Sequence, residues 1–344
     1  MQVLVTGHRG YIGSVLAPML ERAGHQVTGL DSDIFRACDF GDMPVPAPGI
    51  RRDVRDVHPG DLEGFDAVIH LAGLSNDPLG DLDPDLTHEI NTEATLRLAR
   101  SAKAAGVGRF IFSSSCSNYG VATSGVWLNE GAPLNPDTPY AVSKVRSEEG
   151  LDLLADASFT TVSLRSATAY GLSPRIRFDL VGNNLTAWAV ATGQVRLKSD
   201  GMAWRPLVHA EDMAQAFLRA LEAERILVHR QAFNVGRNED CMQIRDLALI
   251  VQEMIPEAEV TFSPGSGADR RTYRVDCSKI RGIGFEPRWC VRAGIAQLRD
   301  AFRARNVKVA DFEGERYQRV AHIRGLMARG ELDLQLRRRA EIAA

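Results

Sequence analysis

Apolar runs and helix-like stretches alternate through the first half of the chain. The four clearest runs are QVLV (2–5), QVTGLD (26–31), DAVIHLAG (66–73) and RFIFSSS (109–115). Stretches with helical character, such as HEINTEATLRLARSAKAAG, separate them. This repetition of strand and helix predicts an α/β fold, a doubly wound parallel sheet with helices on both faces. Because such sheets bind ligands at the carboxyl ends of their strands, we expect the functional site at that edge.

The pattern changes after about residue 170. A loop, YGLSPRIRFDL, precedes the helical VGNNLTAWAVATG and the strand-like QVRLKSDG, and two amphipathic helices follow at EDMAQAFLRALEA and IRDLALIVQEMI. We expect residues 1–170 to form the sheet domain, with later strands returning to it from about 203–240. Residues 171–304 should form mainly a smaller α/β substrate lobe. The tail, 305–344, has Arg, Glu and apolar residues at helical intervals, which predicts a solvated helical extension or a subunit contact.

Composition narrows the class of protein. Of 344 residues, 44% are hydrophobic and 25% are charged, as in ordinary globular proteins. The net charge of −3 gives no general attraction to nucleic acid or to an anionic membrane. No apolar run approaches the roughly 20 residues of a membrane span, and MQVLVTG lacks a signal-peptide pattern. The cysteines show no C-x-x-C spacing. We therefore expect a cytoplasmic protein with buried thiols, no metal, and no nucleic-acid or membrane partner.

Three glycines form the first chemical signal. Gly7, Gly10 and Gly13 make G-x-x-G-x-x-G directly after a strand and at the start of a helix. Such glycines let the backbone approach a pyrophosphate at a helix N-terminus, although a plain strand–helix turn can look the same. Asp31, at the end of the next strand, is placed to bind the ribose hydroxyls of NAD. Arg9 could instead neutralise the 2′-phosphate of NADP. We give Asp31 more weight and expect NAD, with NADP as the alternative.

Two further segments are candidates for the walls of a dinucleotide site. Asp53 and Val54 end the presumed third strand, where an Asp can meet the adenine amino group; a solvated loop Asp is the alternative. Leu71, Ala72 and Gly73 follow the 66–73 run. They are small or apolar, so the chain can pass close under the pyrophosphate.

Tyr140 and Lys144 are the second chemical signal. They form Y-x-x-x-K, and residues four apart lie on one face of a helix. A Lys ammonium near a Tyr hydroxyl favours the phenolate and is expected to lower the Tyr pKa from about 10. Such a Tyr can take the proton of a carbinol as its hydride leaves. Ser113 to Ser115 end a preceding strand, so a Ser hydroxyl can bind the same substrate oxygen.

The chain resembles the extended short-chain dehydrogenase/reductase family, which contains nucleotide-sugar epimerases and dehydratases. The resemblance covers about residues 1–300 and rests on TGHRGYIG, HLAG, SSSCSNYG and PYAVSK in the family's order. It implies a Rossmann domain, a nucleotide-sugar lobe, and Ser115, Tyr140 and Lys144 as the catalytic residues. Tyr11 and Ile12 of the first motif, Ser113, Tyr140 and Lys144 are then cofactor contacts, and Asn91 takes the place of the family's structural or cofactor-side Asn. The resemblance also implies a homodimer.

The resemblance extends to residues that would hold a nucleotide-diphosphate sugar. Asn184 in NNL matches the family's diphosphate-holding Asn, and Arg205 in WRPLVHAEDMA resembles a nucleotide-contacting Arg. Arg271 lies in a D-R-R stretch that resembles one near the diphosphate. Arg175 and Arg177 lie in a loop that resembles G-x-S-P-R-x-R-x-D-L of GDP-heptose 4-dehydrogenase-like proteins. Arg forks and amide donors suit phosphates, although a solvated surface position is the ordinary alternative.

Cys116 and Ser117 narrow the reaction. Resembling dehydratases carry Asp-Glu directly after the catalytic residue, and decarboxylases carry a Glu at the second position. Here neither position is acidic. Resembling 3,5-epimerases place a Cys two residues after the Ser, whereas Cys116 stands one residue early. We count both residues as substrate contacts, with packing under the cofactor as the alternative for Cys116.

The leading interpretation is an NAD-dependent nucleotide-sugar epimerase that transiently oxidises a sugar carbinol at C4, with Tyr140 as acid/base. The main alternative is a nucleotide-sugar 4-dehydrogenase or 4-ketoreductase that releases or consumes a 4-keto sugar. A 4,6-dehydratase and a non-enzymatic NAD(P) sensor are less favoured alternatives. Sensors of this fold typically lose the Tyr or the Lys, and here both remain.

Overall fold

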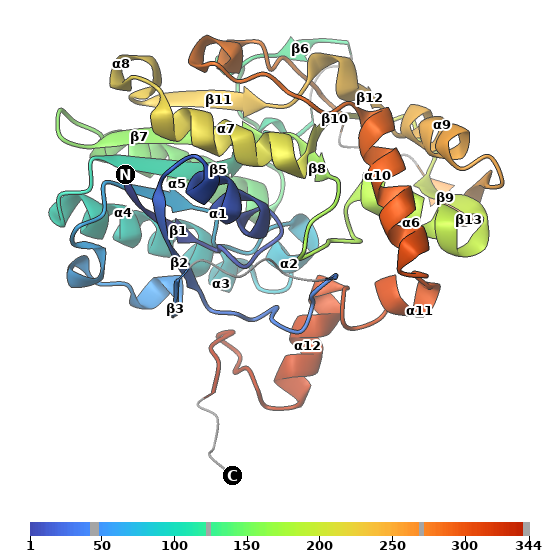
Figure 1. The fold of residues 1–344 in the computed structure, drawn as a ribbon, viewed down its shortest axis with the longest axis horizontal. Helices are drawn as coiled ribbons and strands as arrows, with labels where there is room; N and C mark the ends of the chain where they lie inside the picture. Colours follow the sequence, from blue (N-terminus) through green and yellow to red (C-terminus); the bar gives the residue numbers. More distant parts are fainter. Residues whose placement is uncertain (42–47, 122–124, 268–271, 340–344) are drawn as a thin grey trace.

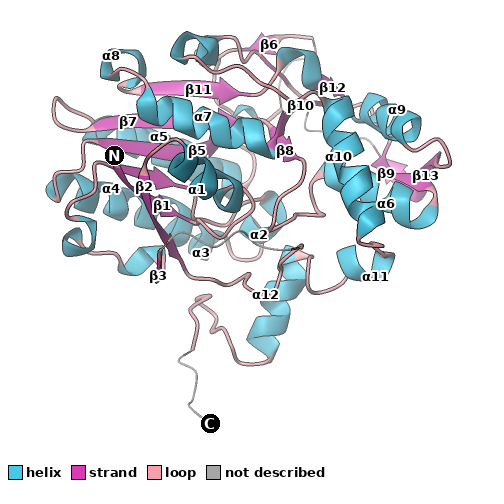
Figure 2. Cartoon of the chain, viewed as in Figure 1, coloured by secondary structure: helices cyan, strands magenta, loops and turns pink. Residues whose placement is uncertain are grey.

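The computed structural model describes residues 1–41, 48–121, 125–267 and 272–339 of the chain. Its centre is a seven-stranded sheet in which every neighbouring pair is parallel, in the order β11-β7-β5-β4-β1-β2-β3 (Figures 1 and 2). The strands are β1 (Gln2–Thr6), β2 (Gln26–Asp31), β3 (Gly49–Arg51), β4 (Ala67–His70), β5 (Arg109–Ser115), β7 (Thr160–Ser166) and β11 (Gln231–Val235). The predicted α/β fold with a doubly wound parallel sheet is confirmed.

Helices cover both faces of this sheet, because successive residues of each strand point to opposite sides. Val3 and Val5 of β1 pack in one core cluster with α1 and α7, whereas Leu4 packs in another with α4 and α5. Figure 1 shows the first pair of helices in front of the sheet and the second pair behind it. These helices are α1 (Gly13–Arg22), α7 (Ala210–Glu222), α4 (Ala94–Ala104) and α5 (Pro139–Leu154).

A smaller lobe is built on a separate three-stranded sheet, β12-β10-β8, and on the parallel pair β9 and β13. The helices α6, α9 and α10 share one apolar cluster with these strands. The elements are β8 (Thr168–Tyr170), α6 (Val181–Thr192), β9 (Gln194–Ser199), β10 (Trp204–His209), β12 (Cys241–Gln243), α9 (Ile244–Met254), β13 (Glu259–Gly267) and α10 (Val291–Ala304).

The prediction that strands return to the large sheet from about 203–240 is only partly right. Strand β11 does return and pairs with β7, Gln231 opposite Val162. Strand β10 does not. It pairs with β8 and β12, Leu207 opposite Thr168, because β11 occupies the free edge of β7.

Short elements complete the connections. They are η1 (Val54–Asp56), η2 (Pro59–Leu62), α2 (Asp77–Gly80), α3 (Pro84–His88), η3 (Glu89–Glu93), η4 (Cys116–Tyr119), β6 (Trp127–Leu128), α8 (Arg225–Val228), η5 (Asn238–Asp240), β14 (Arg274–Val275) and η6 (Lys279–Ile283). None of the helices in the described ranges combines the length and the apolar character that crossing a bilayer requires.

The C-terminal extension, residues 305–339 as described, is packed against the sheet domain rather than solvated. It contains α11 (Val309–Phe312), α12 (Arg319–Ala328) and a turn closed by a bridge between Leu332 and Arg338. Ile323, Leu326, Leu332 and Leu336 form one apolar cluster with Leu74, Leu79, Leu86 and Ile90 of the segment after β4. The expectation of a solvated appendage is therefore wrong, because its apolar residues have partners within the same chain. Figure 1 shows α12 beneath the sheet, apart from α10.

Leu326→Ala tests this packing. The side chain is 4% exposed, whereas that of Leu334, in the same extension, is 78% exposed. Truncating a buried Leu to Ala usually lowers the free energy of unfolding by about 2–5 kcal/mol. Truncating a surface Leu usually changes it by no more than about 0.5 kcal/mol. We expect hydrogen exchange of the α12 amides to show a corresponding loss of opening free energy in Leu326→Ala and none in Leu334→Ala. Equal exchange in the two variants would show that the extension is not docked.

Candidate functional site

A cleft of about 690 Å³ opens at the carboxyl ends of the central strands. Three separate parts of the chain line it: loops of the sheet domain, the smaller lobe and the C-terminal extension. The sheet domain contributes the glycine loop and the ends of β2, β4, β5 and β7. The lobe contributes residues of α6, β9 and β10, and the extension contributes Gln318, Arg319, Ile323 and Leu336. Residues far apart in the sequence therefore meet where a doubly wound sheet binds its ligand.

The glycine loop is packed too tightly for side chains at two of its positions. A Cβ on Gly13 would lie 2.2 Å from the carbonyl oxygen of Gly7, and a Cβ on Gly7 would lie 2.8 Å from the backbone nitrogen of Ala72. Gly7 also has a φ of +73°, which favours glycine. Gly10, Tyr11 and Ile12 line the cleft with them, at the N-terminus of α1. This loop has the shape that the pyrophosphate of a dinucleotide requires.

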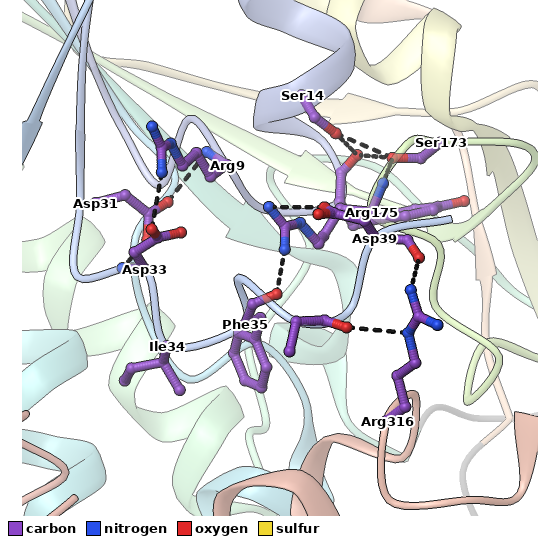
Figure 3. Close-up of polar contacts among 12 residues, drawn as sticks. Arg9, Ser14, Asp31, Asp33, Ile34, Phe35, Asp39, Ser173, Arg175 and Arg316 are labelled. Atoms are coloured by element: carbon purple, nitrogen blue, oxygen red, sulfur yellow. Dashed lines mark hydrogen bonds and ion pairs between the residues drawn. The ribbon is translucent and has the colours of Figure 1, made fainter. Parts of the chain in front are cut away.

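Asp31 and Arg9 lie together with a third residue, Asp33 (Figure 3). The carboxylate of Asp31 accepts hydrogen bonds from the backbone N–H of Arg9 (3.0 Å) and of Asp33 (2.8 Å). The guanidinium of Arg9 forms an ion pair with Asp33, with Nη1 2.7 Å from Oδ2. Arg9 is therefore engaged by a carboxylate, and two carboxylates stand where a 2′-phosphate would have to lie. This arrangement favours NAD over NADP. The sequence reading missed Asp33, although it stands two residues after Asp31.

Asp53 and Val54 line the cleft as expected, but Asp53 is neither solvated nor free. Its carboxylate caps η1 and binds Arg55, accepting from the backbone N–H at 2.9 Å and from Nη2 at 2.7 Å. Burial opposes ionisation of Asp53, but the hydrogen bonds and charge of Arg55 outweigh it, so its pKa lies below the ordinary value. Asp53 was expected to accept a hydrogen bond from the adenine amino group, but Arg55 already occupies both of its carboxylate oxygens.

The segment after β4 lies under the cleft. Leu71, Ala72 and Gly73 line it, but Asn91 does not. The buried side chain of Asn91 accepts from the backbone N–H of Leu74 (2.8 Å) and donates to its carbonyl (3.0 Å) and to Ser143 Oγ (3.2 Å). The structure therefore places Asn91 behind the wall, where it holds the β4 loop against α5. Of the two roles that the resemblance implies for Asn91, structural or cofactor-side, these contacts support the structural one.

Ser113, Ser115 and Tyr140 line the cleft, and Lys144 lies beneath them. Tyr140 is in the first turn of α5, which the Thr138 hydroxyl caps by accepting from the N–H of Ala141. Ser115 is the hydrogen-bonding neighbour of the Tyr140 hydroxyl that favours its ionisation. The ammonium of Lys144 donates to the carbonyl of Ser113 at 2.8 Å and lies 5.6 Å from the centre of the Tyr140 ring.

The expected lowering of the Tyr140 pKa by Lys144 is wrong for the chain by itself. Burial raises the pKa of Tyr140 to about 12, although Ser115 and the charge of Arg177 act in the opposite direction. Burial also lowers the pKa of Lys144 to about 8. Lys144 does not lower the Tyr140 pKa as predicted because its ammonium donates to the Ser113 carbonyl and faces the Tyr140 ring.

A buried ion pair fixes α5 against the sheet. The guanidinium of Arg165, on β7, binds Glu148, on α5, with Nη2 2.7 Å and Nε 3.1 Å from its carboxylate oxygens. The same carboxylate accepts from the hydroxyl of Ser114, on β5, and from Asn118 (3.0 Å). Tyr140 and Lys144 are thereby carried on a helix joined to two of the strands that end at the cleft.

The side chains of Ser117 and Cys116 lie in different surroundings. The Ser117 hydroxyl lies 2.9 Å from that of Ser115, and both residues line the cleft. Cys116 is fully buried away from it, where its thiol donates to the carbonyl of Arg165 at 3.1 Å and packs with Cys277. Burial raises the pKa of the Cys116 thiol well above its ordinary value. The substrate contact predicted for Cys116 is therefore wrong, and packing is its role.

The two arginines of the YGLSPRIRFDL loop also differ. Arg177 lines the cleft, pairs with Asp179 (2.6 Å) and donates to Ser75 Oγ (3.2 Å). Arg175 is buried outside the lining: it donates to the carbonyl of Phe35 and pairs with Asp39 at 3.0 Å (Figure 3). The predicted sugar or phosphate contact of Arg175 is therefore wrong. Its side chain joins this loop to the loop after β2.

The lobe brings further basic and polar groups to the cleft. Asn184 lines it, and its amide donates to the carbonyl of Phe178 at 2.9 Å. Arg205 lines it and lies 5.5 Å from the centre of the Tyr273 ring. Arg271 lies outside the described residues. The sequence reading missed the lining residues Arg196, Lys198, Tyr273, Asp77, Asp179 and Arg319, since no motif marks them.

The described residues include no cluster of three or more His, Cys, Asp or Glu side chains that could hold a metal ion. The described cysteines are all free thiols, and four of the five are buried.

Comparison with known proteins points to one family. Residues 3–236 match the model described as the NAD dependent epimerase/dehydratase family. A UDP-glucose 4-epimerase of Corynebacterium glutamicum is 32% identical over 308 residues, 83% of this chain and 91% of that protein. UDP-glucuronic acid decarboxylase 4 of Arabidopsis thaliana is 28% identical over 322 residues, 89% of this chain and 69% of that protein. A solved structure of MoeE5 in complex with UDP-glucuronic acid and NAD has a TM-score of 0.76 at 26% identity, covering 89% of this chain and 100% of that one.

Lys144→Met tests the electrostatics beneath the site. The pKa of Lys144 is lower in the folded chain, about 8, than its ordinary value of 10.5. The unfolded chain therefore binds more protons between these pH values, and the Lys144 contribution to the free energy of unfolding rises with pH across that window. We expect wild type to gain up to about 3 kcal/mol relative to Lys144→Met from pH 8 to 10.5.

Urea denaturation at several pH values measures this difference. Lys308→Met, at an exposed position, controls for the loss of a lysine. A difference between wild type and Lys144→Met that stays flat with pH would contradict the burial of a charged ammonium at this position.

Proposed function

The chain belongs to the NAD dependent epimerase/dehydratase family, and we propose that it is an NAD-dependent nucleotide-sugar epimerase that oxidises a sugar carbinol, at C4, as a transient step. The observation that carries this proposal is the position of two hydroxyls. Tyr140 and Ser115 lie in one cleft, between a tight glycine loop and a lobe with basic side chains. A dinucleotide and a diphosphate sugar fit these two sides.

The position of each residue in the cleft indicates its role in the proposed reaction. Bound NAD supplies a hydride acceptor whose positive ring favours the phenolate of Tyr140, which burial disfavours. Tyr140 then takes the carbinol proton at its hydroxyl oxygen and later returns it. Ser115 hydrogen-bonds the same substrate oxygen and holds it beside Tyr140. Arg205 and Asn184 bind the diphosphate, because guanidinium forks and amide donors match phosphate oxygens.

The acidic side chains in the cleft do not favour elimination of water. Asp179 pairs with Arg177 and accepts from Asn76 at 2.6 Å. Asp77 accepts from the hydroxyl of Thr138 at 2.7 Å. The two positions after Ser115 carry no carboxylate, and Cys116 is turned away. These observations support oxidation and reduction at one carbon over dehydration.

A 4-dehydrogenase or 4-ketoreductase is the second candidate. Epimerisation requires the keto sugar to turn over within the cleft before hydride returns. The loop that carries Arg177 is pinned by Asp179 and Ser75, and through Arg175 by Asp39. A rigid wall of this kind favours a single sugar orientation, which suits release of a 4-keto product.

Tyr140→Phe tests the acid/base role. Loss of a positioned proton-transfer group typically lowers the rate about 10²–10⁴-fold, so we expect kcat to fall by that factor. Tyr170→Phe is the matched control, since the Tyr170 hydroxyl is buried without a hydrogen-bond partner among the described residues. Unchanged turnover in Tyr140→Phe would remove the proposed mechanism.

Mass spectrometry on a panel of UDP-, GDP- and dTDP-sugars identifies the reaction in the same experiment. A product of unchanged mass with no net NADH means epimerisation. A product about two mass units lighter, with NADH formed, means a 4-dehydrogenase. A product lighter by one water means dehydration and overturns the assignment.

We also propose that the protein is a homodimer that pairs through α4 and α5. Leu153, near the end of α5, is 85% exposed, and Glu149 on the same helix and Arg100 on α4 are also exposed. Light scattering should give twice the chain mass of 37.7 kDa, and Leu153→Asp should return the monomer. A monomeric wild type would contradict the pairing. Leu249→Asp, at an exposed leucine of α9, is the control.

A further inference from the structure

The C-terminal extension closes one end of the cleft. Its last turn is anchored to the ends of β2 and β3 by three polar contacts. Arg55 Nη2 donates to the carbonyl of Gln335 at 2.8 Å, and Arg338 donates to the carbonyl of Asp33 at 2.7 Å. Arg337 pairs with Asp56 at 2.6 Å. The extension therefore lies beside the part of the cleft where Asp31 and Asp53 place the adenosine half of a dinucleotide.

Arg319, the first residue of α12, lines the cleft with a buried guanidinium that has no anionic partner in the described chain. It is 5% exposed, and its guanidinium lies 3.9 Å from the centre of the Phe35 ring. Nη1 is buried with no hydrogen-bond partner, and the contacts among described residues give Arg319 neither an ion pair nor a hydrogen bond. A buried cation without an anion is costly, and burial lowers the pKa of Arg319 to about 10. A ligand anion would remove this cost.

The other arginines of the lining differ from Arg319. Each of the following has a carboxylate partner in the described chain: Arg9 with Asp33, Arg52 with Asp61, Arg55 with Asp53, and Arg177 with Asp179. Arg196 and Arg205 also have interaction partners. Arg319 is thus the lining arginine that has neither an ion pair nor a hydrogen bond among the described residues.

The surroundings of Arg319 indicate which anion it meets. Its guanidinium lies against the ring of Phe35, in the loop that follows Asp31 and Asp33, and Arg319 and Phe35 line the same cleft as the glycine loop. Arg319 therefore lies on the side of the cleft where Asp31 and the glycine loop would hold a dinucleotide. The anionic part of a dinucleotide is its pyrophosphate, and a guanidinium fork matches phosphate oxygens.

We propose that Arg319 binds the pyrophosphate of NAD and that the C-terminal extension is part of the cofactor site. The proposal rests on the use of NAD in the proposed function. A substrate diphosphate is the other source of this chemistry. We favour the cofactor because the extension contacts β2 and β3, whereas Asn184 and Arg205, assigned to the substrate, lie on α6 and β10. Anchored beside the adenosine end, the extension also slows the release of NAD.

Arg319→Met, Arg319→Lys and Arg324→Met form the test. Arg324 lies on the same helix and is exposed, so its change matches the chemistry outside the cleft. The NAD content of each purified protein is measured first, and then the Kd and dissociation rate of NAD by fluorescence titration and stopped flow. A hydrogen-bonded ion contact supports an affinity loss of about ten- to a hundredfold in Arg319→Met. We expect a smaller loss in Arg319→Lys and none in Arg324→Met.

The stability of the NAD-free protein separates ligand binding from a structural role. Removing an unpaired buried charge should leave the Tm of Arg319→Met equal to or above that of wild type. A fall in Tm with unchanged NAD affinity would overturn the proposal in favour of packing. Unchanged NAD affinity with weaker UDP-, GDP- or dTDP-sugar binding would assign Arg319 to the substrate and also overturn it. If wild type itself failed to bind NAD, the proposed function would fall first.

Discussion

The site depends on the buried ion pair between Arg165 and Glu148. It joins β7 to α5, and the same carboxylate accepts from Ser114 on β5. Ser115 at the end of β5 and Tyr140 at the start of α5 must meet at one cleft, although they belong to different elements. A bidentate Arg–carboxylate contact has a restricted geometry, so it can hold a helix against a sheet with little freedom. The placement of the two residues proposed as catalytic, Ser115 and Tyr140, therefore depends on the rigidity of this contact.

The cleft is organised by the pairing of its charges. Arginines of the sheet domain and loops are compensated by nearby carboxylates, as Arg9 is by Asp33 and Arg177 by Asp179. Such pairs shape the walls and leave little net attraction for a phosphate. The attraction for anions then falls on positions without such a pair, and Arg319 is the clearest of them. The C-terminal extension supplies it, so the part of the chain with no readable motif completes a site that the motifs began.

At Tyr140 the surroundings of the side chain, and not the motif spacing, set the chemistry. The Y-x-x-x-K spacing places Lys144 on the same side of α5 as Tyr140, as predicted. Spacing does not say what the ammonium binds. In the structure it donates to the Ser113 carbonyl, and burial sets the pKa of both residues. The same lesson applies to Arg175 and Cys116, whose motifs pointed to the substrate and whose side chains are turned into the protein.

The sequence by itself determined the local features of this protein. Strand and helix periodicity predicted the parallel sheet, and glycine spacing predicted the turn at Gly7 and Gly13, because these depend on residues near one another in the chain. Tertiary structure decided the rest. Three contacts show this: the pairing of β11 with β7, the ion pair of Arg9 with Asp33, and the approach of Arg319 to Phe35. They join residues up to hundreds of positions apart. Their geometry follows from packing and charge compensation across the whole fold, which no local pattern encodes.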